Sequence, residues 1–227
     1  MNKESAGPYG GGGNTFGSID WDLYPGRGWE VYGQFLLDDI QVEKTGPGDL
    51  EPNELGLLTG FRKAHPFSLG GVTCGLEYVA VRNRTYKTAQ FWEWWVHRNK
   101  PIGYYLGSDV EQLAGFVRYW PNRRVSLALR WNRIRLGEGR MDRPWDTPWA
   151  THTLEEGYHE SFPSGVVETT SRLGVELFWL VRPGLFGLVE VGWLGKSNAG
   201  HVTGQRESSW EMKLQFGWEW DFGFPLW

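Results

Sequence analysis

The fold is decided by the stretch from Trp210 to Phe222, which reads Trp-Glu-Met-Lys-Leu-Gln-Phe-Gly-Trp-Glu-Trp-Asp-Phe. Apolar and polar side chains alternate along it almost without exception, and this period of two is typical of a β-strand with one apolar and one polar face. The stretch is longer than the usual strand of about five or six residues. Because an uncovered apolar face promotes aggregation in water but suits a bilayer, we interpret it as a spanning strand of an outer-membrane β-barrel.

The composition of the 227 residues agrees with this interpretation. The chain contains 15 Trp and 32 Gly, and aromatic residues reach 16%, yet the mean hydropathy is -0.46. No segment approaches the roughly 20 apolar residues of a transmembrane helix, whereas a barrel strand needs an apolar residue only at every second position. A net charge of -4 gives no basic surface, so we predict no nucleic-acid partner. The single cysteine, Cys74, excludes an intrachain disulfide.

The same alternation recurs along the chain, and the connections alternate between short turns and long polar loops. Short periplasmic turns and long extracellular loops are typical of outer-membrane barrels. We therefore predict a flexible Gly-rich segment at residues 1–14 and outer-membrane β-barrel strands with long extracellular loops at residues 15–227. The predicted strands lie at residues 19–23, 29–40, 54–63, 72–83, 110–120, 125–136, 170–181, 185–194 and 210–222.

The odd number of predicted strands indicates an incomplete barrel, because single-chain bacterial barrels have even numbers. The N-terminal residues also lack the apolar core of a signal peptide, which an outer-membrane protein requires. We expect the chain to be the C-terminal half of a larger antiparallel transmembrane barrel. The alternative fold is a soluble β-sandwich or a lipocalin-like barrel, in which strands alternate in the same way.

The polar faces of the predicted strands carry charges of both signs. Cross-strand ion pairs inside the barrel are one interpretation, and a polar path for a ligand or solute is the other. Asp38 and Asp39 are adjacent, and neighbours in a strand point to opposite faces unless a bulge intervenes, so we interpret them as the exit of the strand into water. The residues predicted to face the lumen are Glu30, Asp38, Glu77, Arg118, Arg130 and Asn132.

Aromatic residues in the long loops are candidates for ligand binding. Their ring faces stack on the CH groups of sugars, while nearby charged groups take the hydroxyls. The alternative is the interfacial aromatic belt that such barrels share. The residues predicted to bind a polysaccharide are Trp92, Trp94, Trp95, Trp145 and Trp149.

Catalytic motifs are sparse. The sequence contains no Gly-x-Ser-x-Gly elbow, no His-Glu-x-x-His pair and no phosphate-binding loop. His152, Glu155, Glu156 and His159 share one loop and have the side chains to bind a metal, but loops of this composition are usually just solvated. We predict a protein that is not an enzyme and that uses no cofactor and no metal.

One part of the chain resembles a known family. The strand Trp29-Glu-Val-Tyr-Gly-Gln-Phe-Leu-Leu-Asp-Asp-Ile-Gln41, followed by Asn53-Glu-Leu-Gly56 and Leu57-Leu-Thr-Gly60, is similar to the capsule assembly Wzi family. The same pattern continues in Leu76-Glu-Tyr78, Tyr86, Pro101-Ile-Gly103 and Leu106-Gly-Ser-Asp109. The resemblance implies an outer-membrane barrel larger than this chain, which attaches capsular polysaccharide to the cell surface. The resemblance implies no catalytic residues. The upstream strands and the helical periplasmic part of the family have no counterpart in this sequence.

These observations together predict a non-catalytic protein of the bacterial outer membrane. We expect it to bind or organise capsular or surface polysaccharide at the cell surface. A passive outer-membrane channel or porin-like transporter is the alternative. The expected partners are outer-membrane lipid or lipopolysaccharide and the surface polysaccharide.

Overall fold

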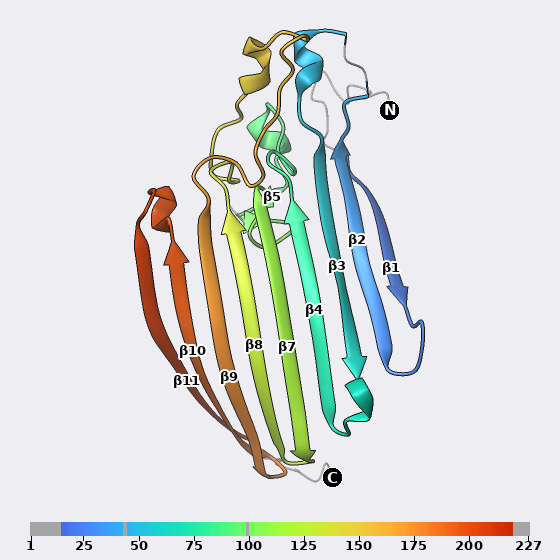
Figure 1. Cartoon of the computed structure of the whole chain (residues 1–227), viewed down its shortest axis with the longest axis vertical. Helices are drawn as coiled ribbons and strands as arrows, with labels where there is room; N and C mark the ends of the chain where they lie inside the picture. The colour runs from blue at the N-terminus through green and yellow to red at the C-terminus, as the bar shows by residue number, and fades with distance from the viewer. Residues whose placement is uncertain (1–14, 43–44, 99, 220–227) are drawn as a thin grey trace, which may run out of the picture.

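One large antiparallel sheet dominates the computed structural model, which describes residues 15–42, 45–98 and 100–219 (Figure 1). The sheet has nine strands, and each strand before the last pairs with the next long strand along the chain. The strands are β1 (Gly17–Leu23), β2 (Trp29–Asp39), β3 (Glu54–Ala64), β4 (Val72–Val81), β7 (Val110–Asn122), β8 (Val125–Leu136), β9 (Glu168–Arg182), β10 (Leu185–Ser197) and β11 (Arg206–Trp218).

The connections carry only short elements. β5 (Val96–His97) and β6 (Lys100–Pro101) form a separate two-stranded sheet. The single turns of 3-10 helix are η1 (Pro47–Leu50), η2 (Pro66–Ser68), η3 (Phe91–Glu93), η4 (Pro148–Thr151) and η5 (Ala199–His201).

The prediction of an all-β antiparallel fold is confirmed, but the sheet is open. β1 and β11 form its two edges and do not pair with each other in the part of the chain that the structure describes. The last strand begins at Arg206, four residues before the alternating stretch, and its predicted end at Phe222 lies outside the described residues, as does the predicted segment 1–14. The short pair β5–β6 was not predicted, because two-residue strands leave no periodic pattern.

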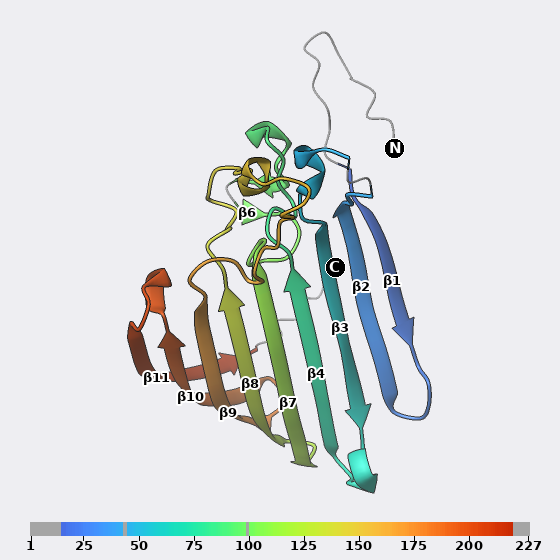
Figure 2. The ribbon, with the colours of Figure 1, turned by 45° about the horizontal axis from the view of Figure 1, so that its top comes forward.

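Alternation of side chains gives the sheet an apolar face and a polar face. The sheet curls, and β9 to β11 bend away from the plane of β1 to β4 (Figures 1 and 2). Exposed side chains of the apolar face include Ile19, Leu23, Trp29, Phe35, Leu76, Val117, Leu127, Leu129, Leu173, Val175, Leu177, Trp179, Val191, Trp193, Trp210, Met212, Leu214, Phe216 and Trp218. The polar face carries Glu30, Tyr32, Arg62, Glu77, Phe116, Arg118, Arg130, Asn132, Arg172, Glu176, Glu190 and Glu211.

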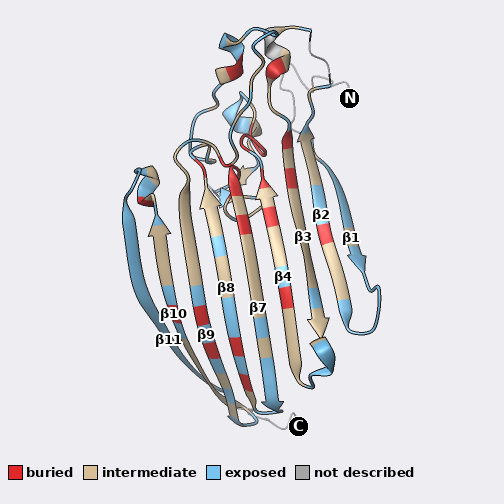
Figure 3. Cartoon of the chain, in the orientation of Figure 1, coloured by how far each residue is buried: buried red, intermediate tan, exposed pale blue. Residues whose placement is uncertain are grey.

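A small apolar core lies at the loop end of the polar face. Val79, Val81 and Val110 point there from β4 and β7, and Tyr86 packs on them from the connection between these strands. Gly103 is needed beside Tyr86, because a Cβ atom there would lie 2.5 Å from the tyrosine ring. Figure 3 shows that most of the other buried residues also gather towards this end of the sheet. The connection therefore folds over the polar face instead of extending away from it.

Candidate functional site

The polar face contains a pocket of about 480 Å³ between β2 and β10. Two rings lie flat against its floor because glycines face them: a Cβ atom on Gly60 would lie 2.7 Å from Tyr32, and one on Gly75 would lie 2.7 Å from Phe116. The hydroxyl group of Tyr32 donates a hydrogen bond of 2.8 Å to Glu77. The guanidinium group of Arg62 lies over the ring of Tyr32, 5.0 Å from its centre, so the pocket combines the ring of Phe116 with charged groups.

Arginine–glutamate pairs link neighbouring strands along this face. Glu176, which is 7% exposed, accepts from Arg118 at 3.0 Å and from Arg130 at 2.8 Å. Arg172 likewise pairs with Glu190 at 3.0 Å and with Glu211 at 3.1 Å. Each arginine bonds its glutamate through a terminal nitrogen, and the Nε atoms of Arg118 and Arg172 have no hydrogen-bond partner among the described residues. The pairs fix the arginine and glutamate side chains in the wall of the pocket, and the two Nε atoms themselves are buried.

The structure brings four of the six predicted polar residues into this pocket. Glu77, Arg118, Arg130 and Asn132 all line it. Glu30 lies outside, but its carboxylate accepts a hydrogen bond from Arg62, which lines the pocket.

Asp38 lies at the other end of the polar face, and its interpretation as an exit into water is wrong. A bulge shifts the pairing register between Leu37 and Asp39, so Asp38 is an extra residue in β2. Its carboxylate accepts a hydrogen bond of 2.8 Å from the backbone N–H of Tyr86 and shares another with the buried Glu54. Asp38 therefore holds the connection after β4 against the sheet.

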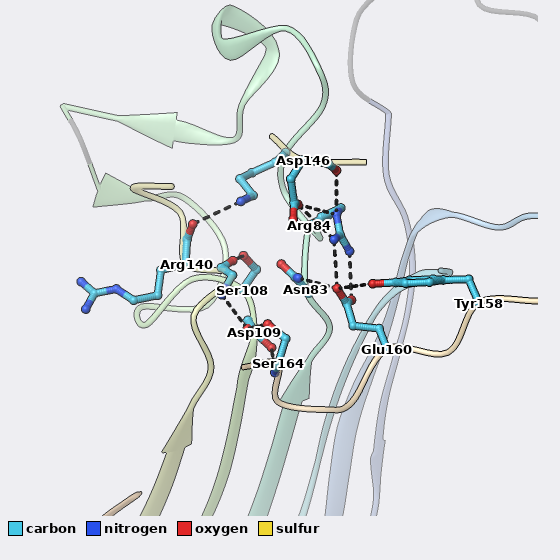
Figure 4. Close-up of polar contacts among 11 residues, drawn as sticks. Asn83, Arg84, Ser108, Asp109, Arg140, Asp146, Tyr158, Glu160 and Ser164 are labelled. Carbon is cyan, nitrogen blue, oxygen red and sulfur yellow. Dashed lines mark hydrogen bonds and ion pairs between the residues drawn. The ribbon is translucent and has the colours of Figure 1, made fainter. Parts of the chain in front are cut away.

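At the loop end of the sheet, residues 82–98, 100–109 and 137–167 pack together into a unit that is here called the loop cap; Figure 4 shows polar contacts that join its segments. Arg84 is its centre and is only 1% exposed. Its guanidinium group forms ion pairs with Glu160 at 2.9 Å and Asp146 at 3.0 Å, and it lies 4.7 Å from the centre of the Trp149 ring. Burial by itself lowers the pKa of Arg84, but its hydrogen bond and charge interactions with Glu160 outweigh burial and raise it, so the group stays charged.

Asp109 fixes the other end of the first cap segment. It is fully buried and accepts hydrogen bonds from the backbone N–H groups of Gly139 at 2.8 Å and Ser164 at 2.9 Å. Lys87, also buried, donates to the carbonyl oxygen of Arg140 at 3.1 Å. Burial, followed by the nearby charge of Arg84, lowers the pKa of Lys87. Sequence reasoning missed these residues, because no local pattern separates them from the other charges of the loops.

The loop cap meets the pocket through a chain of hydrogen bonds. The hydroxyl group of Tyr104 in the cap donates to Gln112 of β7, and the amide group of Gln112 donates to Asn132 at 2.9 Å. Asn132 lines the pocket. A ligand in the pocket would therefore touch a residue that the loop cap positions.

The five predicted tryptophans fall into different environments. Trp92 is 64% exposed and Trp95 is 38% exposed, so their rings are accessible. Trp94 is half-buried and donates from Nε1 to the carbonyl oxygen of Thr88 at 2.8 Å. Trp145 is also half-buried and lies edge-on to Trp149, with 6.4 Å between the ring centres. Trp149 is 3% exposed and its face is covered by Arg84, which leaves no surface for a sugar.

The loop with His152 and Glu156 is organised by its own local bonds. Glu156 accepts from the backbone N–H of Thr153 at 2.9 Å, and His152 contacts the carbonyl oxygen of Pro148. Within the described ranges, no group of three or more His, Cys, Asp or Glu side chains is placed to hold a metal ion.

The fold and the site define an all-β protein in which one antiparallel sheet carries a charged pocket beneath a loop cap. No family model, no curated protein and no solved structure matches the chain. In the part of the chain that the structure describes, no helix has the length and apolar character needed to cross a membrane.

Proposed function

We propose that the chain is part of an outer-membrane β-barrel that binds surface polysaccharide through its polar-face pocket and the exposed tryptophans of its loop cap. The apolar face then contacts lipid, and the polar face lines the lumen. The resemblance to the capsule assembly Wzi family belongs to the same proposal and suggests capsular polysaccharide as the ligand.

The proposal that the sheet lies in a membrane is supported by the path that the apolar residues follow across the sheet. Strand pairing aligns Leu23 of β1, through successive partners, with Trp210 of β11. The long loops join the strands at one end of the sheet and the short turns at the other. On β1 the apolar side chains lie between this row and the loop end, whereas on β11 they continue from this row towards the turn end, from Met212 to Trp218. The apolar band therefore crosses the strands obliquely.

The slope of this band approaches the strand tilt of barrels in a bilayer. From β1 to β11, which is eight steps between neighbouring strands, the centre of the band moves by about six residues along the strands. With about 3.3 Å per residue and about 4.8 Å between strands, the slope is about 30°. Strands of membrane barrels tilt by about 35–45° from the barrel axis. A lipid layer of constant height crosses tilted strands obliquely, which explains this band. The covered face of a soluble sheet does not require its apolar residues to follow such an oblique path.

The strand directions suggest how the sheet is completed. Each of the nine strands is antiparallel to its neighbours, so β1 and β11 run in the same direction. Pairing them directly would join two parallel strands, whereas an odd number of further strands would close an antiparallel barrel. The proposal of a larger barrel favours the second arrangement.

The polysaccharide part rests on the chemistry of the two surfaces. The pocket presents the ring of Phe116 next to arginine and amide groups, which suits the CH groups and hydroxyls of sugars, whereas the ring of Tyr32 is covered by the guanidinium group of Arg62. Trp92 and Trp95 add accessible rings on the loop cap. A chain of sugars that passes from the loop cap to the pocket would use both.

Replacing Trp92 by alanine should weaken polysaccharide binding by about two- to twelvefold, because an aromatic contact contributes about 0.5–1.5 kcal/mol. The probe is the surface polysaccharide extracted from the organism that encodes the chain, and binding is measured on the chain reconstituted in lipid vesicles. Phe67→Ala is the matched control, since Phe67 is 96% exposed but lies in a turn at the opposite end of the strands. Equal binding by wild type and Trp92→Ala would count against polysaccharide binding by the exposed tryptophans of the loop cap.

The charges of both signs along the polar face favour a second candidate, a passive channel. In planar bilayers such a channel should conduct, and Arg130→Glu should raise its preference for cations, because the new carboxylate stands beside Glu176. Arg124→Glu, in the exposed turn before β8, is the control and should change selectivity much less. Absence of conductance in the wild type would exclude this candidate and leave the binding protein.

A further inference from the structure

The apolar face ends in a polar border towards the loops. On β8, β9 and β11 the last large apolar side chains are Trp131, Leu173 and Trp210, which lie in one pairing row. The next outward-facing positions are hydroxyls and arginines: Arg133, Arg135, Thr169, Ser171, Ser197, Arg206 and Ser208. This border lies where the oblique apolar band leaves the strands.

Two of its arginines have no partner among the residues that the structure describes. Arg135 forms an ion pair with Glu111 of β7. Arg133 and Arg206 are exposed, and neither forms an ion pair or a side-chain hydrogen bond with any described residue. By contrast, the polar-face arginines Arg62, Arg118, Arg130 and Arg172 are all paired with glutamates. The border therefore carries two positive charges that no ion pair within the described ranges neutralises.

A groove of about 400 Å³ opens in this border on β9, β10 and β11. Its lining includes Thr169, Ser171, Ser208 and Arg206, together with two further charged residues, Lys196 and Glu207. The ring of Trp193 lies across Gly195, where a Cβ atom would come within 2.4 Å of it, so the glycine makes room for the ring in the wall of the groove. Arg133 stands next to the groove, because it pairs in register with Ser171. Hydroxyl donors and the guanidinium group of Arg206 thus line a space that Arg133 adjoins and that reaches Trp193 of the apolar band.

We infer that this groove, together with Arg133 and Arg206, binds the phosphorylated headgroup of an anionic lipid. Guanidinium groups bind phosphate through paired hydrogen bonds, and the hydroxyls add further donors. The acyl chains of the same lipid would cover Trp193, Trp210 and Leu173, and this continuity favours a lipid over a free phosphate. The inference rests on the proposed function, since it requires the apolar face to lie in a bilayer.

The test compares two lipid probes that differ only in phosphate. The complete barrel protein of the proposal, which contains this chain, is reconstituted into phosphatidylcholine vesicles that contain either bisphosphorylated lipid A or dephosphorylated lipid A. It is then purified in mild detergent, and the lipid A retained per protein is measured by mass spectrometry. The variants are Arg133→Gln, Arg206→Gln and the double variant, with Arg124→Gln as the matched control, an exposed arginine at the turn end.

Wild type and Arg124→Gln should retain clearly more of the bisphosphorylated lipid A than of the dephosphorylated lipid A. Each border variant should lower its affinity by about fivefold, and the double variant by about 25-fold, from the roughly 1 kcal/mol that each arginine contributes near an anionic lipid. Equal retention of the two lipids, or a double variant equal to wild type, would overturn the lipid site. Flotation separates this failure from that of the proposed function: a chain that does not float with the vesicles refutes the membrane sheet itself, whereas a floating chain without phosphate preference refutes only the lipid site.

Discussion

Arg84→Met should open the loop cap and lower its stability by about 3–5 kcal/mol, the usual cost of removing one partner of a buried ion pair. Arg84 is 1% exposed, and its loss leaves Glu160, with a side chain only 15% exposed, without its counter-charge. Methionine keeps most of the volume beside Trp149, so the expected loss comes from charge and hydrogen bonds and not from a cavity. Hydrogen exchange at the backbone N–H groups of Tyr86 and Gly139 measures the opening.

The matched control for this prediction is Arg140→Met in the same loop cap. Arg140 pairs with Asp142 at 3.3 Å, but these side chains are 49% and 65% exposed. Exposed pairs contribute about 0–1 kcal/mol, so exchange at the reporter amides should hardly change. If Arg84→Met leaves exchange at both amides as slow as in the control, the loop cap does not depend on the buried pair.

Leu214→Arg should prevent stable insertion into a bilayer, with an expected cost of about 2–4 kcal/mol for an arginine at the centre of a lipid-facing strand. Leu214 is the middle of the apolar residues of β11 and is 56% exposed, so no protein contact compensates for the new charge. The measurement is folding of the chain into phosphatidylcholine vesicles in a urea titration, followed by flotation.

Gln215→Arg provides the control for the bilayer prediction, because it adds the same charge to the next residue of the same strand. Gln215 lies on the polar face, opposite Leu188, and should accept arginine with little loss of insertion. If the two variants insert equally well, the apolar face does not contact lipid and the membrane proposal fails. If both fail, edge strand β11 is intolerant of arginine in general and the apolar face is not the cause.

Much of the sheet could be predicted from the sequence, since a period of two in hydrophobicity fixes both the strand and its two faces. The stretch from Trp210 shows this, and so do the predicted strands at residues 125–136 and 185–194, which correspond to β8 and β10. The same parity placed Glu77, Arg118, Arg130 and Asn132 on one face, where the structure finds them together in a pocket. These features depend only on neighbours along the chain.

Only the tertiary structure decided the contacts that join distant segments. The bulge at Asp38 directs its carboxylate to Tyr86, and Trp149 is buried because Arg84 reaches across the loops to cover it. The pairing of Arg118 and Arg130 with one carboxylate, Glu176, depends on the register of β7, β8 and β9. Alternation determines which way a side chain points, but the partner that it meets depends on strand register and loop packing, which are set by the free energy of the whole fold.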